Sequence, residues 1–290
     1  MAMLIAEIGG SSSRWALLDG DAPAMLFPLQ GEGMPGLNPL SGDPELFAQG
    51  IRSYFLERQP VALNARAVIA YGAGCGTPER AAIMEGALRQ LWPAASISVS
   101  TDLDGAARGL WSDGSGLVIV LGTGSSVGWF DGARLHQRFP SLGYVLGDEG
   151  SGADIGRALL QDAFYRRMPD DLRAALFGEE GPSLSAVLEE VYRSPFPSRA
   201  LAAHAGRLAA FLHEDYVREL ITARFEAFIE AFKPFHPAEQ REQVRATGSV
   251  AWGFREILAD RLLDHGMELQ SVERDPLNGL VAWHRRPIGP

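Results

Sequence analysis

Two segments of the chain share one alternation of apolar runs and glycine-rich turns. Residues 3–8 form a short apolar run that ends in glycines and serines, and residues 15–18 form a second run that stops at Asp19-Gly20. Residues 117–121 and 128–130 repeat this order around a Gly-Thr-Gly-Ser-Ser turn. An apolar run, a turn and a second run that ends at a reversal are typical of a β-hairpin. We therefore expect two hairpins of the same kind.

The two predicted hairpins align with each other when Gly9 is set on Gly122. This alignment places Ser12 on Ser125, and the trailing strands and their Asp-Gly turns then agree within one residue. Glycine and serine are common in turns, so two hairpins can also match by accident. We interpret the match as a duplication, in which each half of the chain is built on one copy.

Strands and helices alternate along much of the remaining chain. Thr77 and Pro78 supply an N-cap and a first-turn proline for one helix, which gives that helix a clear start. The predicted strands lie at 67–71, 97–100, 244–247 and 269–272. The predicted helices lie at about 78–92, 103–111, 152–168, 184–192, 201–213, 216–233 and 249–265, with a last one from 276. Such alternation predicts parallel α/β layers.

Composition and charge narrow the classes of function. A chain of 290 residues with 46% apolar residues can bury the cores of two ordinary domains. A net charge of −10 argues against a nucleic-acid partner, which normally meets a basic face. The apolar start is broken at Glu7 and no 18-residue apolar stretch follows, so we expect a soluble cytoplasmic protein without a membrane partner.

Rare residue types exclude further classes of site. Cys75 is the only cysteine, so the chain by itself can form neither an internal disulfide nor a paired-cysteine metal site. The histidines show neither HxxxH nor HExxH spacing. Lys233 is the only lysine and precedes a proline, which excludes a P-loop of the GxxxxGK[ST] type.

A glycine-rich turn after a strand can be a dinucleotide fingerprint, a phosphate-binding hairpin or a plain turn. The fingerprint requires a helix directly after the turn, whereas both turns here lead into strands. Glycine lets the backbone approach an anion, and turn N–H groups with serine or threonine hydroxyls can hold phosphate without lysine. A related pair of such turns favours the phosphate-binding interpretation and predicts a nucleotide cleft.

Five segments in order resemble a known superfamily. They are LIAEIGGSSSRW, STDLDGAARGL, LVIVLGTGSSVGW, GYVLGDEGSGADIGR and VRATGSVAWGF. This order resembles the acetate and sugar kinase, Hsp70 and actin superfamily, and within it most closely the N-acetylglucosamine kinase and BadF/BadG/BcrA/BcrD-type ATPase family. The resemblance covers nearly the whole chain. It implies an α/β fold of two duplicated ribonuclease H-like (actin-like ATPase) domains with a nucleotide cleft between them.

The resemblance also implies the domain bounds. An N-terminal domain over residues 1–105 would carry the first phosphate hairpin and the sugar loops, and a C-terminal helix at 276–290 could complete it. A C-terminal domain over residues 106–275 would carry the second phosphate hairpin and the adenosine motif.

ATP and Mg²⁺ are the ligands that the resemblance implies for the two turns. The residues implied to contact the nucleotide are Gly9, Gly10, Ser11, Ser12, Ser13, Gly122, Thr123, Gly124 and Ser125, with Gly248 and Ser249 as the adenosine motif. Glu7 stands where the family usually has an aspartate that helps to hold Mg²⁺. Its extra methylene group could displace the ion.

Asp102 matches the catalytic base of the family through the Thr101-Asp102 pair. A hydroxyl that attacks a γ-phosphoryl group needs a carboxylate within hydrogen-bond reach to take its proton. Asp104 is a nearby rival for this role, and an aspartate at the start of a helix is also a common N-cap.

The residues implied to contact a sugar are Asn38, Gly72, Ala73, Gly74 and Asp148. Amide and carboxylate groups suit this work because they exchange directed hydrogen bonds with hydroxyls. Asp148 and its neighbour Glu149 also lie ahead of a predicted helix, where capping is the alternative role.

Three functions follow from these residues. The expected one is an ATP-dependent kinase that phosphorylates an amino sugar, N-acetylglucosamine at its 6-hydroxyl, and forms a homodimer. The second is a non-catalytic sugar or nucleotide sensor in which Glu7 has removed turnover. The third is an activator ATPase for an acyl-CoA reductase or dehydratase, which needs cysteines to hold an iron-sulfur cluster, whereas this chain offers only Cys75.

Overall fold

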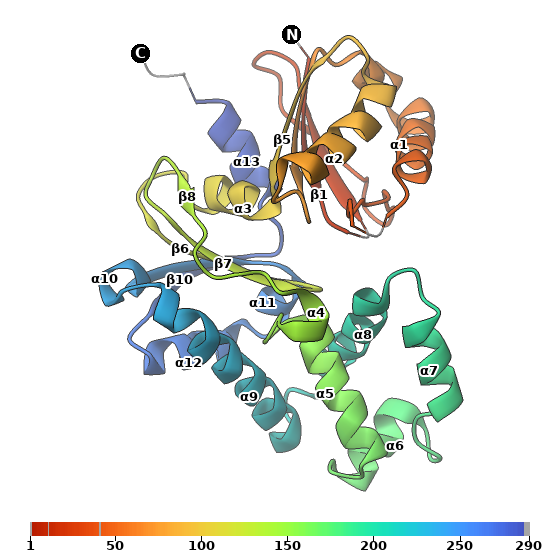
Figure 1. Ribbon diagram of the computed structural model, residues 1–290, viewed down its shortest axis with the longest axis vertical. Helices are drawn as coiled ribbons and strands as arrows, with labels where there is room; N and C mark the ends of the chain where they lie inside the picture. The colour runs from red at the N-terminus through yellow and green to blue at the C-terminus, as the bar shows by residue number, and fades with distance from the viewer. Residues whose placement is uncertain (1, 11, 41, 287–290) are drawn as a thin grey trace. The chain divides into compact units, whose positions relative to one another are not determined.

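The computed structural model describes residues 2–10, 12–40 and 42–286, which form two compact units (Figure 1). The first unit comprises residues 1–112 and 276–290, and the second comprises residues 113–275. The boundary expected between residues 105 and 106 falls inside helix α3 (Asp102–Leu110). A helix packs as one body, so all of α3 belongs to the first unit and the boundary follows Ser112.

The first unit is built on a mixed five-stranded sheet. In the order β3-β2-β1-β4-β5, the central strand β1 pairs antiparallel with β2 and parallel with β4. The strands are β1 (Met3–Ile8), β2 (Ser13–Leu18), β3 (Met25–Phe27), β4 (Ala67–Gly72) and β5 (Ser96–Thr101). Because parallel strands end at the same edge, the residues after β1, β4 and β5 emerge together.

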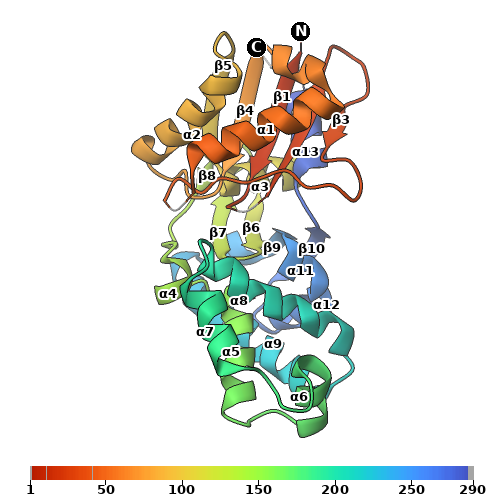
Figure 2. The same ribbon diagram turned by 90° about the vertical axis from the view of Figure 1, so that its right-hand side faces the viewer.

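Helices cover both faces of this sheet (Figure 1 and Figure 2). Helices α1 (Pro44–Arg58) and α2 (Pro78–Leu91) cover one face, where Trp15, Phe55 and Trp92 form the core. Helix α13 (Leu277–His284) packs on the other face against Ile5 and Tyr71, beside α3. As expected, Thr77 caps α2, since its side chain accepts a hydrogen bond from the Arg80 N–H.

The second unit repeats the same sheet topology. Its order is β10-β9-β6-β7-β8, and the central strand β6 pairs antiparallel with β7 and parallel with β9. The strands are β6 (Gly116–Leu121), β7 (Ser125–Phe130), β8 (Leu135–His136), β9 (Gln243–Thr247) and β10 (Glu268–Glu273). The two expected hairpins are thus β1–β2 and β6–β7, each with a third antiparallel strand and two parallel ones. This repeat supports the interpretation of a duplication.

Most of the helices that the structure describes belong to the second unit. They are α4 (Gly143–Leu146), α5 (Gly152–Phe164), α6 (Asp170–Phe177), α7 (Leu184–Tyr192), α8 (Pro197–Gly206), α9 (Asp215–Phe232), α10 (Ala238–Arg241), α11 (Ser249–Gly253) and α12 (Arg255–Asp264). Across the described ranges, no helix is both long and apolar enough to cross a membrane.

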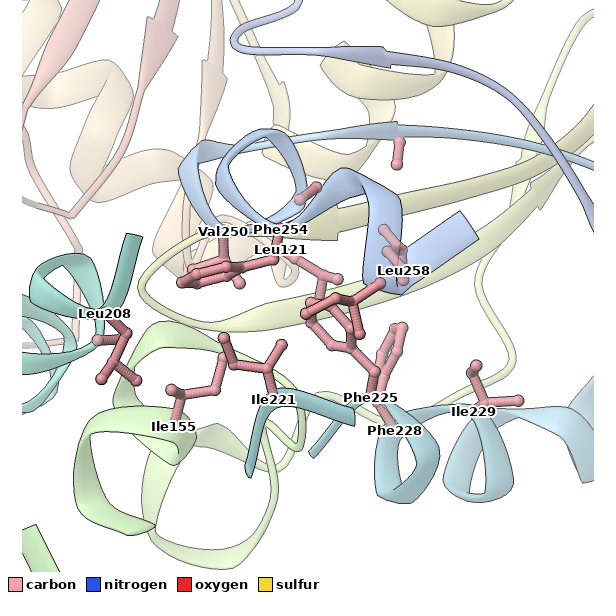
Figure 3. Close-up of a cluster of buried hydrophobic side chains, with 14 of the residues drawn as sticks. Leu121, Ile155, Leu208, Ile221, Phe225, Phe228, Ile229, Val250, Phe254 and Leu258 are labelled. Carbon is pink, nitrogen blue, oxygen red and sulfur yellow. The ribbon is translucent and has the colours of Figure 1, made fainter. Parts of the chain in front are cut away.

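Helix α9 provides the apolar face that organises the second core (Figure 3). Ile221, Phe225 and Phe228 are fully buried, and they pack with Leu121, Val250, Phe254 and Leu258 from the sheet and the helices behind it. Burial of one such side chain contributes about 1.5–3 kcal/mol. The three-to-four spacing of apolar residues in this helix therefore serves packing.

Three expected helices end or begin elsewhere in the structure. Helix α5 stops at Phe164 because Arg166 adopts a positive φ of 54°. Helix α8 begins at Pro197, a residue that suits the first helical turn, and continues as a 3₁₀ helix at Arg207–Phe211. The helix expected over 249–265 is broken at Phe254 into α11 and α12.

Helices α3 and α13 of the first unit cross at two glycines. A Cβ atom on Gly279 would clash with the carbonyl oxygen of Gly109, and one on Gly109 would lie 2.7 Å from the carbonyl oxygen of Pro276. The absence of side chains lets the two backbones approach closely. Because α3 ends just before the chain leaves this unit and α13 follows its return at Pro276, the exit and the re-entry lie side by side.

The substitution Gly279→Ala is expected to destabilise the first unit by about 2 kcal/mol, since the added methyl group must push α13 away from α3. The matched control is Gly86→Ala in α2, where an added Cβ meets no atom within 4 Å. Gly86 is an exposed helical glycine, so its substitution should raise the free energy of unfolding by about 0.5–1 kcal/mol. Urea unfolding followed by circular dichroism measures both changes, and equal effects would contradict the close crossing.

Candidate functional site

Three loops of the first unit meet at the edge where β1 and β4 end. The Ala73 N–H donates to the carbonyl oxygen of Ile8 (2.8 Å), and the Leu37 N–H donates to that of Gly9 (3.0 Å). A Cβ atom on Gly74 would lie 2.6 Å from Asn38 Oδ1, and one on Gly10 would lie 3.5 Å from Asn38 Cβ. The glycines thus leave room for the Asn38 side chain.

The amide of Asn38 is oriented by its own loop. Its Oδ1 atom accepts a hydrogen bond from the Leu40 N–H at 3.0 Å. Gly74 has a φ of +75°, a backbone conformation that residues other than glycine rarely adopt. The structure therefore brings together four of the residues expected to bind a sugar: Asn38, Gly72, Ala73 and Gly74.

Asp102 lies at the same edge, at the first position of α3. Strand β5 pairs in parallel with β4, and Thr101 lies opposite Gly72. Asp102 Oδ1 accepts a hydrogen bond from the Leu103 N–H (2.9 Å), and the carboxylate is half-buried. Burial and the charge of Asp102 together raise the pKa of the Cys75 thiol to about 11. Asp102 therefore faces the loop that holds the expected sugar-binding residues.

The rival carboxylate, Asp104, has a structural task. Thr101 is the N-cap of α3, and its side chain accepts from the Asp104 N–H at 3.0 Å. In return, Asp104 Oδ2 accepts from the Thr101 hydroxyl (2.7 Å) and from the Thr101 N–H (3.3 Å). This capping box accounts for Asp104. The capping role that was considered for Asp102 is therefore filled by Thr101 and Asp104.

The first turn is closed by a hydrogen bond from the Gly9 N–H to the carbonyl oxygen of Ser12 at 2.9 Å. Ser13 is buried, and its hydroxyl donates to the Pro35 carbonyl (2.6 Å) while it accepts from the Trp15 indole (2.8 Å). That hydroxyl holds β2 to the 31–43 loop, which favours a structural role over the expected phosphate contact. Ser12 is exposed, whereas Ser11 lies outside the described residues.

Glu7 lies next to the last position of β1, opposite Arg14 on β2 and Tyr71 on β4. Mg²⁺ is usually held by one or two carboxylates together with substrate phosphates, so a carboxylate at this edge is compatible with the ion. Arg14 lies directly opposite on the paired strand and is a positive charge beside Glu7. The assignment of Glu7 as the metal ligand stays a prediction from the resemblance.

The second turn is enclosed by two other segments of its unit. The Gly152 N–H donates to the Gly122 carbonyl (2.8 Å) and the Ala153 N–H to the Thr123 carbonyl (3.2 Å), which anchors the start of α5 on the turn. Gly248 has a φ of +111°, and a Cβ atom there would clash with the Leu121 carbonyl. The residues expected to bind the nucleotide in this unit, namely Gly122, Thr123, Gly124, Ser125, Gly248 and Ser249, are therefore close together.

Two hydroxyl groups beside this turn are buried without a partner. Ser125 Oγ and Thr247 Oγ1 have no hydrogen bond to any residue that the structure describes, although their side chains are only 5% and 3% exposed. A buried unsatisfied hydroxyl costs about 1–3 kcal/mol. The position of a Cβ atom on Gly122 faces open space. These features fit a polyphosphate, whose oxygens accept hydrogen bonds and approach the backbone.

Asp148 lies against the second turn in a strained conformation. Its φ is +59°, and a Cβ atom on Gly124 would lie 3.0 Å from its Oδ2 atom. Burial raises the pKa of Asp148 to about 6, and the charges of Glu149 and Asp154 add to this effect. A hydrogen bond from the Ser125 backbone opposes the shift. The expected sugar ligand is thus a carboxyl group that titrates near neutral pH.

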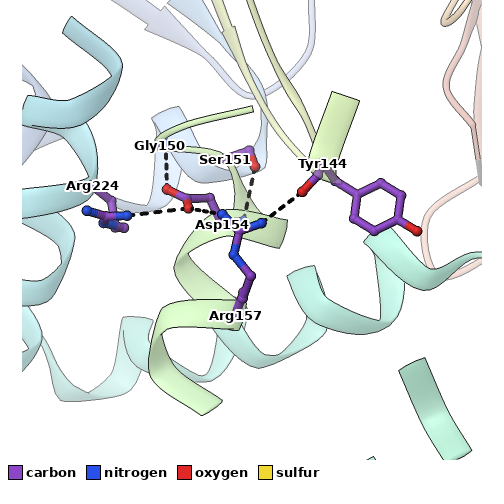
Figure 4. Close-up of polar contacts among 6 residues, drawn as sticks. All are labelled: Tyr144, Gly150, Ser151, Asp154, Arg157 and Arg224. Carbon is purple, nitrogen blue, oxygen red and sulfur yellow. Dashed lines mark hydrogen bonds and ion pairs between the residues drawn. The ribbon is translucent and has the colours of Figure 1, made fainter. Parts of the chain in front are cut away.

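A buried ion-pair network fixes the loop that carries Asp148 (Figure 4). Asp154 is 2% exposed and accepts from the Gly150 N–H (3.0 Å) and from Arg157 (2.7 Å), with Arg224 at 3.5 Å. Arg157 also donates to the Tyr144 carbonyl at 2.8 Å. Sequence reasoning missed Asp154.

Ser151 is the N-cap of α5, since its hydroxyl accepts from the Asp154 N–H at 3.2 Å. Neither Asp148 nor Glu149 caps this helix. The pattern Ser-x-x-Asp at residues 151–154 is a capping signal that could have identified both residues.

One cluster in the described part of the chain has metal-ligand geometry. Ligand atoms of Glu226, Glu230 and His265 lie within 4.8 Å of one another. The Lys233 ammonium donates to Glu230 (2.7 Å) and contacts His265 Nδ1 (3.1 Å). Lysine therefore supplies the positive charge of this cluster, which ties the end of α9 to the end of α12.

Solved structures that resemble this chain include two putative N-acetylglucosamine kinases. The protein from Porphyromonas gingivalis is 33% identical with a TM-score of 0.86, over 97% of this chain and 98% of that one. The protein from Chromobacterium violaceum is 20% identical with a TM-score of 0.72, over 97% and 98%. A ROK family glucokinase from Streptomyces griseus, solved with glucose and AMPPNP, is 16% identical with a TM-score of 0.60, over 98% of each chain.

These similarities confirm the expected fold class of two duplicated ribonuclease H-like, actin-like ATPase domains. The two repeated sheets agree with this fold. No protein-family model matches the sequence, and a search of curated proteins found no match.

The substitution Asp148→Asn is expected to stabilise the ligand-free protein above pH 6. The folded-state pKa of about 6 exceeds the ordinary value of 3.8. Below pH 3.8 the carboxyl is protonated in both the folded and the unfolded protein. The wild-type protein therefore loses stability as pH rises through 6, because the buried carboxyl then carries a charge. The full shift corresponds to about 3 kcal/mol, which solvent screening reduces to about 1–2 kcal/mol. Thermal unfolding at pH 4 and pH 8 measures the difference.

Asp131→Asn is the control with the opposite sign. Hydrogen bonds from His136 and from two backbone N–H groups lower the pKa of Asp131 to about 2. The Asp131 carboxylate stabilises the folded protein above pH 3.8, and this contribution is lost as pH falls toward 2. Asp131→Asn should therefore be less stable than the wild-type protein at neutral pH. A stabilising effect of Asp148→Asn that is equal at both pH values would contradict the raised pKa.

Proposed function

This chain belongs to the same family as the putative N-acetylglucosamine kinase of Porphyromonas gingivalis, and on that premise we propose that it is an ATP-dependent sugar kinase. The observation that carries the proposal is the meeting of Asp102 with the loops of Asn38 and Gly72–Gly74 at one sheet edge. A candidate base thus lies beside a loop cluster that has a fixed amide and an open glycine backbone.

The sugar is held through directed hydrogen bonds in this proposal. Asn38 offers amide groups whose orientation is set by the Leu40 N–H. The Gly72–Gly74 segment, which lacks large side chains, lets sugar hydroxyls approach the backbone. Asp148 contributes a carboxylate that accepts hydroxyl hydrogen bonds above its pKa of about 6.

The nucleotide is bound by the turns. The hydroxyls of Ser125 and Thr247, buried without partners among the described residues, donate to phosphate or ribose oxygens. Gly122, Thr123 and Gly124 provide backbone groups, and Gly248 and Ser249 meet the adenosine. Glu7 is the residue that would hold Mg²⁺, and the bound ion would offset the negative charge of the phosphates.

Asp102 acts as the general base. It takes the proton of the sugar hydroxyl as that oxygen attacks the γ-phosphorus of ATP, and the bond from this phosphorus to the bridging oxygen of ADP breaks. The products are a sugar phosphate, ADP and the protonated Asp102, which releases its proton to water. The proposed substrate is N-acetylglucosamine, phosphorylated at its 6-hydroxyl.

An ADP-release assay with N-acetylglucosamine, glucosamine, N-acetylmuramic acid and glucose tests the function. We expect sugar-stimulated turnover, with the highest kcat/KM for N-acetylglucosamine and a product that NMR identifies as the 6-phosphate. Well-folded protein that shows no sugar-stimulated ADP release would overturn the proposal. Calorimetric binding of sugar or ATP without turnover would instead support a sensor.

Asp102→Asn is expected to lower kcat by about 10²–10⁴-fold, because the amide cannot take a proton. Asp104→Asn keeps an acceptor oxygen for Thr101 and should retain kcat within about threefold, with a loss of stability near 1 kcal/mol at the helix cap. Steady-state kinetics and thermal unfolding separate the two variants. Loss of turnover in Asp104→Asn but not in Asp102→Asn would show that Asp104, and not Asp102, is the base.

A further inference from the structure

Three polar side chains of the first unit form a chain of hydrogen bonds outside the residues assigned above. The Tyr71 hydroxyl accepts from Arg108 Nη1 at 2.9 Å and lies 2.8 Å from His284 Nε2. The Arg108 guanidinium lies 5.6 Å from the centre of the Tyr71 ring. Tyr71 is fully buried, whereas Arg108 and His284 are half-buried. These residues come from β4, α3 and α13.

The protonation states set the direction of these hydrogen bonds. Burial lowers the pKa of His284 to about 4, and the charge of Arg108 adds to the effect, so the imidazole is neutral at pH 7. Burial also raises the pKa of Tyr71, so the phenol keeps its proton. Arginine can only donate. Arg108 therefore donates to the Tyr71 oxygen, and in the His284 tautomer that carries its proton on Nδ1 the Tyr71 hydroxyl donates to Nε2.

The hydroxyl of Tyr71 links the two helices to the strand that leads into the sugar loop. Tyr71 immediately precedes Gly72, and its ring packs on Gly105 of α3, where a Cβ atom would lie 2.8 Å from the ring. Arg108 lies on the same helix, six residues after Asp102. A shift of Arg108 against Tyr71 would therefore move the start of α3 relative to Gly72.

We propose that Tyr71, Arg108 and His284 form a positioning network that sets the distance of Asp102 from the Gly72–Gly74 loop. The inference rests on the proposed kinase reaction for its effect on turnover, but the position of Asp102 can be measured without turnover. Tyr71 touches no reacting atom in this proposal and acts through α3. A displacement of about 1 Å at a reacting group lowers the rate by about 10²-fold.

Packing of the ring alone does not replace the hydroxyl. The contact of the ring with Gly105 restrains the separation of β4 and α3, but an apolar contact is not directional. The hydrogen bond from Arg108 fixes that remaining freedom, because it is directional and charge-assisted. His284 orients the hydroxyl so that its lone pairs face Arg108.

The test is Tyr71→Phe, with Tyr54→Phe as the matched control. The Tyr54 hydroxyl also makes two hydrogen bonds in the first unit, from the Leu29 N–H (2.8 Å) and to Glu32 (2.6 Å), but neither partner lies on α3. We expect Tyr71→Phe to lower kcat by about 10–100-fold while KM for ATP changes less than twofold. Tyr54→Phe should lower the Tm by a similar amount and leave kcat within twofold.

Variants of His284 test the direction of the hydrogen bonds. His284→Gln keeps an acceptor near the position of Nε2 and should retain kcat within about threefold. His284→Leu removes the acceptor and should reproduce the loss seen in Tyr71→Phe. If both variants keep full kcat, the role of His284 in orienting the hydroxyl is wrong.

Cys75 provides a readout that needs no turnover. Its thiol is buried, and the charge of Asp102 contributes to its raised pKa. A shift of α3 should therefore change the rate at which iodoacetamide alkylates this only cysteine, and we expect about a fivefold or larger increase in Tyr71→Phe. The rate should remain unchanged in Tyr54→Phe.

The two readouts separate failure of this inference from failure of the proposed function. Absence of turnover in the wild-type protein counts against the kinase, while the alkylation rates still decide the positioning role. Unchanged alkylation in Tyr71→Phe overturns the network, as does a kcat loss that Tyr54→Phe shares in proportion to its lower Tm.

Discussion

The candidate site depends on how one strand in each unit pairs with its neighbours. Strand β1 is antiparallel to β2 on one side and parallel to β4 on the other, and β6 is placed in the same way between β7 and β9. A hairpin turn after the central strand must then emerge at the edge where the parallel strands end. This constraint alone places the first turn next to the Gly72–Gly74 loop and Asp102, and the second turn next to Gly248.

The elements at these edges could be predicted because their signals are local. Glycine turns between apolar runs marked both hairpins, and the Thr77-Pro78 pair marked the start of α2. The choice between Asp102 and Asp104 could not be made from sequence, since either aspartate can cap a helix. The hydrogen bonds of Thr101 show that Asp104 is the capping aspartate. Likewise, the buried hydroxyl of Ser13 could be distinguished from its exposed neighbour only once the 31–43 loop was in place.

Unfavourable contributions to stability gather around the second turn. Asp148 combines a positive φ with a buried carboxyl of raised pKa, and two buried hydroxyls nearby have no partner among the described residues. The surrounding structure must offset these terms. The Asp154 ion pairs hold the loop that carries Asp148, and the aromatic core on α9 stabilises the second unit. Local conflicts of this kind are expected at functional sites, where ligand contacts replace the missing partners.

The scarcity of lysine limits how either turn could hold a phosphate. The only lysine is paired with Glu230 and His265 at the end of α9, so no lysine can meet phosphate at the turns. In the proposed function, backbone N–H groups, hydroxyls and a metal ion contact the phosphates. Backbone groups can approach an anion only where side chains are absent, and of these glycines Gly122 has a Cβ position that faces open space. In the proposed function, the ion that Glu7 would hold supplies the charge that a P-loop lysine would otherwise provide.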